Sequence, residues 1–355
     1  MTKASPEVAA LAPWLSANLP ELGRVDAMRK FGDGQSNPTY LIEAEGGRFV
    51  LRAQPPGKLL KGAHRVDREY RVMQALADTD VPVPRMLLLS GEDGPLERMF
   101  FVMEYVEGAI CWDPALPELD ASQRARMYDA MNHTLASLHD LDPAALGLED
   151  YGRPGDYFAR QLATWTRQYR ASETDGGHRD IDRLIDWLNE NLPPDDGQAG
   201  LVHGDYRLDN MIFDPDALTV RAVLDWELST LGHPYADLAY QCMQWRLPNE
   251  GSFRGLAGVD REALGIPDEA SYVAAYCARR GLDGIENWSY YVAFSFFRLA
   301  AILQGVYRRW LDGNASNAET AQRYGAAVPV LAELAMEEVR RADRRTGSDY
   351  SSHSQ

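Results

Sequence analysis

The stretch His203-Gly-Asp205-Tyr-Arg207-Leu-Asp-Asn210 places an acidic residue and an amide in the pattern His-x-Asp-x-x-x-x-Asn. Apolar residues flank this stretch, Leu201 and Val202 before it and Met211 to Phe213 after it. A further β-rich run then ends on a second acidic residue, Asp225. Short apolar runs bounded by polar loops indicate buried strands. A hairpin-like pair of strands would bring both carboxylates and the amide into one cleft.

This spacing suits the transfer of a phosphoryl group to a hydroxyl group. Asp205 can accept the proton of the attacking hydroxyl, Asn210 can bind Mg²⁺ through a neutral oxygen, and Asp225 can bridge the metal to nucleotide phosphates. Arg207 can stabilise the charge of the transferred group, or it simply pairs with Asp205 or Asp209. A solvated polar loop followed by an ordinary turn is the alternative, and the number of matched parts disfavours it.

The segment from about Arg29 to about Tyr307 resembles the aminoglycoside phosphotransferase and choline kinase-like family of small-molecule kinases. The segments LVHGDYRLDNMIFDP and VLDWELSTLGHPYADLAY are most similar to the kinase-like domain of certain acyl-CoA dehydrogenase fusions and its stand-alone bacterial relatives. The resemblance implies a two-lobed, protein-kinase-like α+β fold, with ATP as co-substrate and Mg²⁺ as cofactor. It also implies a hydroxyacyl-CoA or a related lipid-derived alcohol as one acceptor candidate.

Three residues that follow or begin the motif match the pattern of the resembled family. His203 is expected to anchor the loop by packing and hydrogen bonding rather than to act as a base. Asp237 is expected to cap a helix or to anchor the catalytic loop. Glu227 matches the pattern without an assigned role.

A glycine-rich turn, Gly32-Asp-Gly34-Gln-Ser36-Asn37, lies between the first two predicted strands. Glycine lets the backbone approach a ligand closely, so the N–H groups of this turn could contact ATP phosphates together with Ser36. Gly34 and Ser36 are therefore candidate nucleotide-binding residues. An ordinary hairpin turn is the alternative.

The strand Val50-Leu51-Arg52 occupies the place of the lysine-bearing strand of kinases, and here the basic residue is Arg. Arg presents a permanently charged planar fork that can pair with phosphate and carboxylate. The resembled subgroup also carries Arg there, which implies the same role, with Glu69 of the next predicted helix as its partner. A surface Arg on an edge strand and a solvated Glu are the alternatives. Met103 to Glu107 resembles the hinge between kinase lobes, where backbone groups of Glu104 and Val106 would bind the adenine edge.

Hydrophobic periodicity predicts a β-rich part followed by a helical part. We expect strands at 28–31, 39–43, 48–52, 86–89 and 99–105, and helices at 6–20, 64–76, 121–138, 156–172, 178–191, 234–246, 268–280, 285–310 and 317–342. These elements predict a small N-terminal nucleotide-binding lobe over residues 1–107 and a larger catalytic and acceptor-binding lobe over residues 108–345. The polar residues 346–355 are expected to be disordered.

Composition excludes several classes of partner. The 355 residues carry a formal net charge of −17, which disfavours nucleic-acid binding and docking on anionic membranes. The longest apolar stretch, Tyr290 to Phe297, is cut by Arg298, so no transmembrane helix is expected. The three cysteines are far apart and indicate reduced thiols in a cytoplasmic protein. The oligomeric state and the choice between ATP and GTP are left open.

The C-terminal helices should form the acceptor pocket, although aromatic residues at helical spacing are more typical of a core. Candidates are Trp245, Trp288, Tyr290, Tyr291, Phe294, Phe297 and Trp310, with Arg298, Arg308 and Arg309. Because no acidic cluster suits a polycationic aminoglycoside, an apolar acceptor that carries a hydroxyl group, with or without a phosphate, fits better.

We therefore expect transfer of the γ-phosphoryl group of ATP or GTP to a small-molecule hydroxyl. A catalytically silent nucleotide-binding protein is the alternative, because Arg52 replaces the usual Lys. A protein kinase is disfavoured, since no Ala-Pro-Glu follows Asp225.

Overall fold

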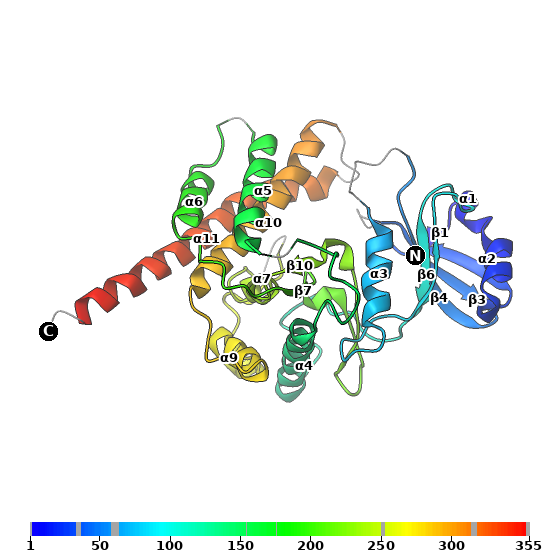
Figure 1. The fold of residues 1–355 in the computed structure, drawn as a ribbon, viewed down its shortest axis with the longest axis horizontal. Coiled ribbons are helices and arrows are strands. Elements are labelled where there is room, and N and C mark those ends of the chain that lie inside the picture. Colours follow the sequence, from blue (N-terminus) through cyan, green and yellow to red (C-terminus); the bar gives the residue numbers. More distant parts are fainter. Residues whose placement is uncertain are drawn as a thin grey trace. The chain divides into compact units, whose positions relative to one another are not determined.

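The computed structural model describes residues 2–32, 37–57, 64–153, 155–174, 176–249, 253–313 and 318–352, with side chains up to residue 344. The chain divides into two compact units. The first comprises Met1–Ile110, Ala144–Glu149 and Asp209–Ser229, and the second comprises Cys111–Pro143, Asp150–Leu208 and Thr230–Gln355. The first is rich in strands and the second is mainly helical, which confirms the expected α+β class (Figure 1). The lobe boundary expected at residues 107 and 108 stays a prediction.

The first unit is built on an antiparallel six-stranded sheet in the order β1-β2-β3-β4-β6-β5. Its strands are β1 (Thr2–Lys3), β2 (Val25–Lys30), β3 (Thr39–Ala44), β4 (Gly47–Ala53), β5 (Met86–Ser90) and β6 (Phe100–Glu104). Ala44 pairs with Gly47, so a tight turn joins β3 and β4 as the Gly-Gly sequence indicates. The register places β4 in the middle of the sheet, between β3 and β6.

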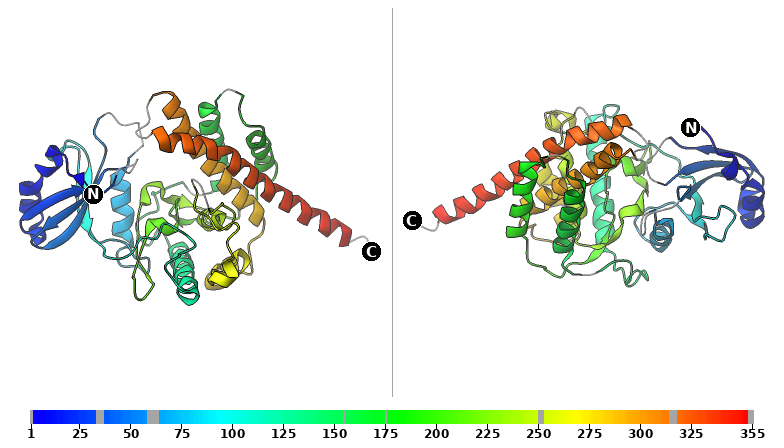
Figure 2. Two further views of the ribbon diagram at one scale, coloured as in Figure 1. Left: turned by 180° about the vertical axis from the view of Figure 1, so that it is seen from behind. Right: turned by 90° about the horizontal axis from the view of Figure 1, so that it is seen from above.

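Helices cover both faces of this sheet (Figures 1 and 2). The segments α1 (Pro6–Ala9), α2 (Ala12–Asn18) and η1 (Pro20–Leu22) pack on one face, in a cluster that includes Leu51 and Phe100. Helix α3 (Val66–Leu76) packs on β5 and β6, where the rings of Tyr70 and Phe101 lie 6.3 Å apart. Because side chains alternate along a strand, Leu51 points to the first helices and Arg52 points to the side of α3.

A second, two-stranded sheet belongs to the same unit and presents the motif residues. Strands β8 (Met211–Phe213) and β9 (Val220–Val223) pair antiparallel, and the short helix η3 (Trp226–Leu228) follows. The N–H of Leu224 donates to the carbonyl oxygen of Asn210 at 2.8 Å. Trp226 is fully buried and donates through Nε1 to the carbonyl of Val223 at 2.9 Å. Asn210 therefore directly precedes β8 and Asp225 follows β9, so both lie at the same end of this hairpin.

The second unit consists of helices around one small two-stranded sheet. The helices are α4 (Ala121–Asp140), α5 (Tyr157–Ser172), α6 (Arg179–Glu190), α7 (Tyr235–Cys242), η4 (Met243–Trp245), α8 (Arg261–Leu264), α9 (Glu269–Arg279), α10 (Trp288–Leu311) and α11 (Ala318–Ser352), and the strands are β7 (Gly200–Val202) and β10 (Thr230–Gly232). Asp120 forms a capping box with Gln123 at the start of α4, as expected for a helix cap. Helix α11 extends to Ser352 and so includes most of residues 346–355, for which disorder was expected.

Helix α10 is the core of the second unit. Within the described residues it is the helix whose length and composition would allow a membrane span, but 78% of its apolar window is buried inside the protein. Its contacts with α5, α7 and α11 are those of a core helix. Tyr290, Tyr291, Phe294 and Phe297 are buried, so these candidates for the acceptor pocket belong to the core.

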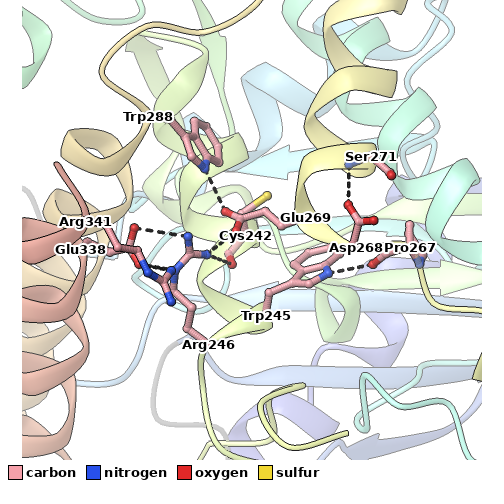
Figure 3. Close-up of polar contacts among 10 residues, drawn as sticks. All are labelled: Cys242, Trp245, Arg246, Pro267, Asp268, Glu269, Ser271, Trp288, Glu338 and Arg341. Atoms are coloured by element: carbon pink, nitrogen blue, oxygen red, sulfur yellow. Dashed lines mark hydrogen bonds and ion pairs between the residues drawn. The ribbon is translucent and has the colours of Figure 1, made fainter. Parts of the chain in front are cut away.

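A buried ion-pair cluster joins four helices of this unit (Figure 3). Arg246, after η4, binds Glu269 of α9 at 2.7 Å and Glu338 of α11 at 2.6 Å. Arg341 adds a contact to Glu338 at 2.6 Å, and Trp288 of α10 donates to Glu269 at 2.9 Å. Burial disfavours the charge of Arg246, but the two carboxylates outweigh it and raise the pKa of Arg246. Removing one partner from such a cluster leaves an uncompensated buried charge, so the cluster fixes how these helices pack.

Candidate active site

The structure distributes the predicted site residues over both units, and the chain passes from the second unit to the first between Leu208 and Asp209. The first unit holds Arg52, Glu69, Glu104, Val106, Asn210 and Asp225, whereas the second holds Asp205 and Arg207. Gly34 and Ser36 lie outside the described residues.

In the first unit, Arg52 is surrounded by three carboxylates. Its Nε lies 2.9 Å from Glu69, and its Nη2 lies 2.6 Å from Asp225 and 3.7 Å from Glu227. The expected pair of Arg52 and Glu69 is therefore present. Arg52 stands on an interior strand with a side chain 14% exposed, so it is not a surface residue of an edge strand. Its Nε–H is not aligned with the Glu69 oxygen, which makes this contact an ion pair rather than a hydrogen bond.

Glu69 is the buried acid of this cluster and is 1% exposed. The side-chain Nδ2 of Asn37 donates to Glu69 at 2.8 Å, and Nδ1 of His64 lies 2.9 Å from the side-chain oxygen Oδ1 of Asn37. Burial raises the pKa of Glu69 to about 7; the attraction of Arg52 opposes this rise, and the charge of Asp225 adds to it. Burial also disfavours the charge of Arg52, but the surrounding carboxylates outweigh it and raise the pKa of Arg52. The cluster therefore keeps its cation and holds Glu69 close to protonation at neutral pH.

The donor set at Asp225 fits a hard divalent cation. Asp225 has the left-handed φ of 64°, which directs its carboxylate away from the regular path of β9. Its side chain is 34% exposed and that of Glu227 is 30% exposed, so both carboxylates reach solvent. Three carboxylates face one guanidinium, which leaves an excess of negative charge when all are ionised. Carboxylate and amide oxygens are ligands that Mg²⁺ accepts, with phosphates and water completing its octahedron.

In the second unit, Asp205 is held in its ionised form. Burial alone would raise its pKa, but the charge of Arg207, a hydrogen bond from the Tyr240 hydroxyl and the charge of Arg298 contribute to lowering the pKa of Asp205 overall. Arg207 Nε lies 3.3 Å from Asp205, and the Arg207 side chain is 46% exposed. Arg207 thus pairs with Asp205, and its contact with a transferred phosphoryl group stays a prediction.

The backbone of the loop that begins at His203 is anchored by Asp237, as expected. Its carboxylate accepts the N–H of His203 at 2.6 Å and that of Gly204 at 2.8 Å, and it is 1% exposed. His203 is fully buried and accepts the N–H of Asp205 at 3.1 Å, which confirms its expected role as a loop anchor. Buried acceptors of backbone N–H groups fix a loop because leaving those groups unpaired is costly. Asp205 is therefore presented on a rigid backbone.

The segment expected to bind adenine lies at the end of β6. The N–H of Glu104 already donates to the carbonyl of Arg85 at 3.0 Å. The N–H of Val106 makes no hydrogen bond with the residues that the structure describes. The role of both residues in binding a base stays a prediction.

Three residues of the site were given no role from the sequence, and a fourth, Arg298, was named only as a candidate for the acceptor pocket. Asn37 and Glu227 complete the cluster around Arg52, and Tyr240 and Arg298 stand beside Asp205. Only Arg298 gives a clear local signal, because it interrupts the most apolar run of the chain. Two hollows lie away from these residues, one of about 840 Å³ among α4, α8 and α9 and one of about 800 Å³ among α9, α10 and α11. Trp288, a candidate for the acceptor pocket, lines the second.

Comparison with known proteins shows the family of this chain. The model of the family described as "Phosphotransferase enzyme family" matches residues 27–273. Mouse acyl-CoA dehydrogenase family member 10 is 49% identical over 307 residues, which cover 86% of this chain and 28% of that protein. Human acyl-CoA dehydrogenase family member 11 is 41% identical, with 86% of this chain and 39% of that protein covered. The chain spans less than half the length of these relatives.

Solved structures share the fold. A protein of Ralstonia eutropha JMP134, provisionally named an aminoglycoside phosphotransferase, superposes with a TM-score of 0.85 at 44% identity, over 94% of this chain and 98% of that one. The aminoglycoside phosphotransferase APH(4)-Ia, solved with AMP-PNP and hygromycin B, has a TM-score of 0.58 at 14% identity, over 90% of this chain and 97% of that one. The two-lobed, protein-kinase-like fold is thereby confirmed.

Proposed function

The chain belongs to the phosphotransferase enzyme family, and we propose that it transfers the γ-phosphoryl group of ATP to a hydroxyl group of a small molecule. The observation that carries this proposal is that the chain holds both an ionised, backbone-anchored Asp205 in the second unit and a carboxylate cluster around Arg52 in the first. Phosphoryl transfer depends mainly on positioning and on electrostatic stabilisation, and these two groups supply both.

The cluster in the first unit would bind the nucleotide. Asn210 and Asp225 would hold Mg²⁺, which neutralises phosphate charge when bound. Arg52, oriented by Glu69, would contact the phosphates, with Gly34 and Ser36 as further candidates. Backbone groups of Glu104 and Val106 would bind the base. The excess of carboxylates over cations around Arg52 supports a site that is completed by a divalent cation.

The catalytic loop of the second unit would act on the acceptor. Asp205 would accept the proton of the attacking hydroxyl as the new oxygen–phosphorus bond forms and the bond to the ADP oxygen breaks. Arg207 would neutralise the charge of the transferred group. Asp237 and His203 would hold the loop in place, so that Asp205 needs no rearrangement before reaction.

For the acceptor, we propose a hydroxyacyl-CoA or a related lipid-derived alcohol. The names of the relatives support this, because proteins named as acyl-CoA dehydrogenase family members contain a segment similar to this chain. We also propose a cytoplasmic location, which the three unpaired cysteines support. A silent nucleotide-binding protein is the second candidate, favoured only by Arg52 at the position of the usual Lys.

A screen for acceptor-dependent ADP formation tests the proposal. The purified chain would be incubated with MgATP or MgGTP and a panel of alcohol-bearing metabolites that includes hydroxyacyl-CoA thioesters. We expect ADP and a phosphorylated product with at least one alcohol, and no product with Asp205→Asn. Tight binding of MgATP without transfer to any alcohol would contradict the proposal and favour the silent protein.

A further inference from the structure

Arg298 is a buried cation beside the catalytic carboxylate. It lies in the middle of α10 and is 8% exposed. Its guanidinium carbon stands 5.2 Å from the ring centre of Tyr240 and 5.6 Å from that of Trp165. The hydroxyl of the same Tyr240 donates to Asp205. One tyrosine therefore links the guanidinium of Arg298 to the carboxylate of the catalytic loop.

The hydrogen-bonding capacity of Arg298 is unused. It forms no hydrogen bond and no ion pair within 4 Å among the residues that the structure describes. Asp205, the nearby acid, already pairs with Arg207. The nitrogens of Arg298 are not among the solvent-excluded unpaired atoms, so they still reach solvent. A mostly buried arginine normally pairs with a carboxylate, and among the described residues no carboxylate lies within 4 Å of Arg298, although its charge acts on Asp205.

Two aromatic rings help to stabilise the charge of this mostly buried guanidinium. Its carbon lies over the rings of Tyr240 and Trp165, and cation–π contacts of this kind favour a cation. A guanidinium has five N–H donors, and those of Arg298 have no hydrogen-bond acceptor among the residues that the structure describes. An Arg with such free donors can bind a planar or tetrahedral oxyanion through two parallel hydrogen bonds.

We propose that Arg298 binds an oxyanion carried by the acceptor, so that the alcohol phosphorylated by this protein bears a carboxylate or a phosphate. This inference rests on the proposed function, because it assigns the acceptor to the Asp205 side of the site. Asp205 would orient the hydroxyl while Arg298 fixes the charged group of the same molecule. The opposite preference would hold for a polycationic aminoglycoside, which Arg298 would repel.

The test compares matched probes with and without charge. The probes are straight-chain hydroxycarboxylic acids with two to six carbons between the groups, the corresponding diols, and the monophosphates of those diols. The variants are Arg298→Met, which removes the charge, and Arg298→Lys, which keeps the charge and removes the fork. Arg183→Met is the control, because Arg183 lies exposed on α6 of the same unit and pairs with Asp180. Binding is measured by calorimetry without nucleotide, and transfer is measured by steady-state kinetics.

The wild-type protein should bind and use a charged probe at least about tenfold better than its matched diol, since charge-assisted hydrogen bonds carry such preferences. Arg298→Met should remove this preference by raising the KM of the acceptor, with the KM of ATP unchanged. Arg298→Lys should keep part of the preference, and Arg183→Met should keep all of it. Between carboxylate and monophosphate, the better probe identifies the source of the oxyanion.

Several outcomes would overturn the proposal. One is equal binding of diols and charged probes by the wild-type protein. This comparison needs no variant, so it tests the proposal even if Arg298→Met does not fold. Another is a rise in the KM of ATP rather than of the acceptor, which would assign Arg298 to the nucleotide. If charged probes bind through Arg298 but no probe is phosphorylated, the proposed function fails and the oxyanion site stands.

Discussion

Replacing Arg52 by Leu should destabilise the first unit by about 3–5 kcal/mol at pH 8, because removing one partner of a buried ion pair leaves an uncompensated charge. Arg52 lies 2.9 Å from Glu69 and 2.6 Å from Asp225, with Glu227 at 3.7 Å. Without the guanidinium, three carboxylates would face one another, and Glu69 among them is 1% exposed.

The loss should depend on pH, and its direction follows from Glu69. Burial raises the folded-state pKa of Glu69 from 4.5 to about 7. Between these values the folded state holds more protons than the unfolded state, so this group's contribution to stability falls as pH rises through that window. Without Arg52 the pKa of Glu69 rises further. The deficit of the variant should therefore grow above pH 7, by about 1.4 kcal/mol for each unit that the pKa has moved.

Urea unfolding at pH 6 and pH 8 measures this effect. The double variant Arg52→Leu/Glu69→Gln should lose the additional pH dependence, because the buried titrating group is gone. Arg48→Leu is the matched control, since Arg48 stands on the same strand, is 44% exposed and pairs with Glu107 at the surface. Such a pair is worth less than about 1 kcal/mol. Equal losses for Arg48→Leu and Arg52→Leu, or a deficit independent of pH, would refute the reasoning.

Three further substitutions test separate parts of the structure. Asp225→Asn should weaken MgADP binding at least about tenfold in calorimetry, because a neutral amide neutralises no cation; an unchanged affinity would remove Asp225 from the metal site. Asp237→Asn should lower kcat more than it changes the KM of ATP, since only one oxygen remains for two backbone N–H groups, and unaltered kinetics would argue against the loop anchor. Glu338→Gln should lower the free energy of unfolding, measured with urea, by about 3 kcal/mol, because it breaks the pair with buried Arg246. The control Glu333→Gln, at an exposed position of the same helix, should change it little, and equal unfolding midpoints for the two variants would contradict this account.

The strands and helices of this chain follow closely from its periodicity. The hairpin of β3 and β4 carries a Gly-Gly turn, and α4 begins at a capping Asp120. The pair of Arg52 and Glu69 was predicted from the resemblance to kinases, and the alternation along β4, which turns Arg52 to the side of α3, accounts for it. Residues 346–352 are one exception, because their polar composition indicated a tail, whereas the helix of α11 continues through them. Residues 6–20 are another, because the single helix expected there is divided into α1, α2 and the start of η1.

The remainder of the site depends on packing between distant segments. No local sequence feature shows that Asn37 would donate to Glu69, or that the guanidinium of Arg298 would lie over the rings of Trp165 and Tyr240. Those contacts join segments that are far apart in sequence, and no periodicity encodes such a meeting. The aromatic residues of α10 show a different limit of sequence patterns. Their helical spacing is compatible with both a core and a pocket, and only their burial in the structure shows that they belong to the core.

The most direct test of the central claim is the rate of phosphoryl transfer by Asp205→Asn. The substitution keeps the shape of the side chain and its hydrogen bonds but removes the proton acceptor. General base catalysis contributes about a hundred- to ten-thousand-fold. At saturating MgATP, with the acceptor found in the screen, kcat should fall by about this factor while the Kd of MgATP stays nearly unchanged. Equal turnover by the two proteins would contradict the assignment of Asp205 as the residue that activates the acceptor.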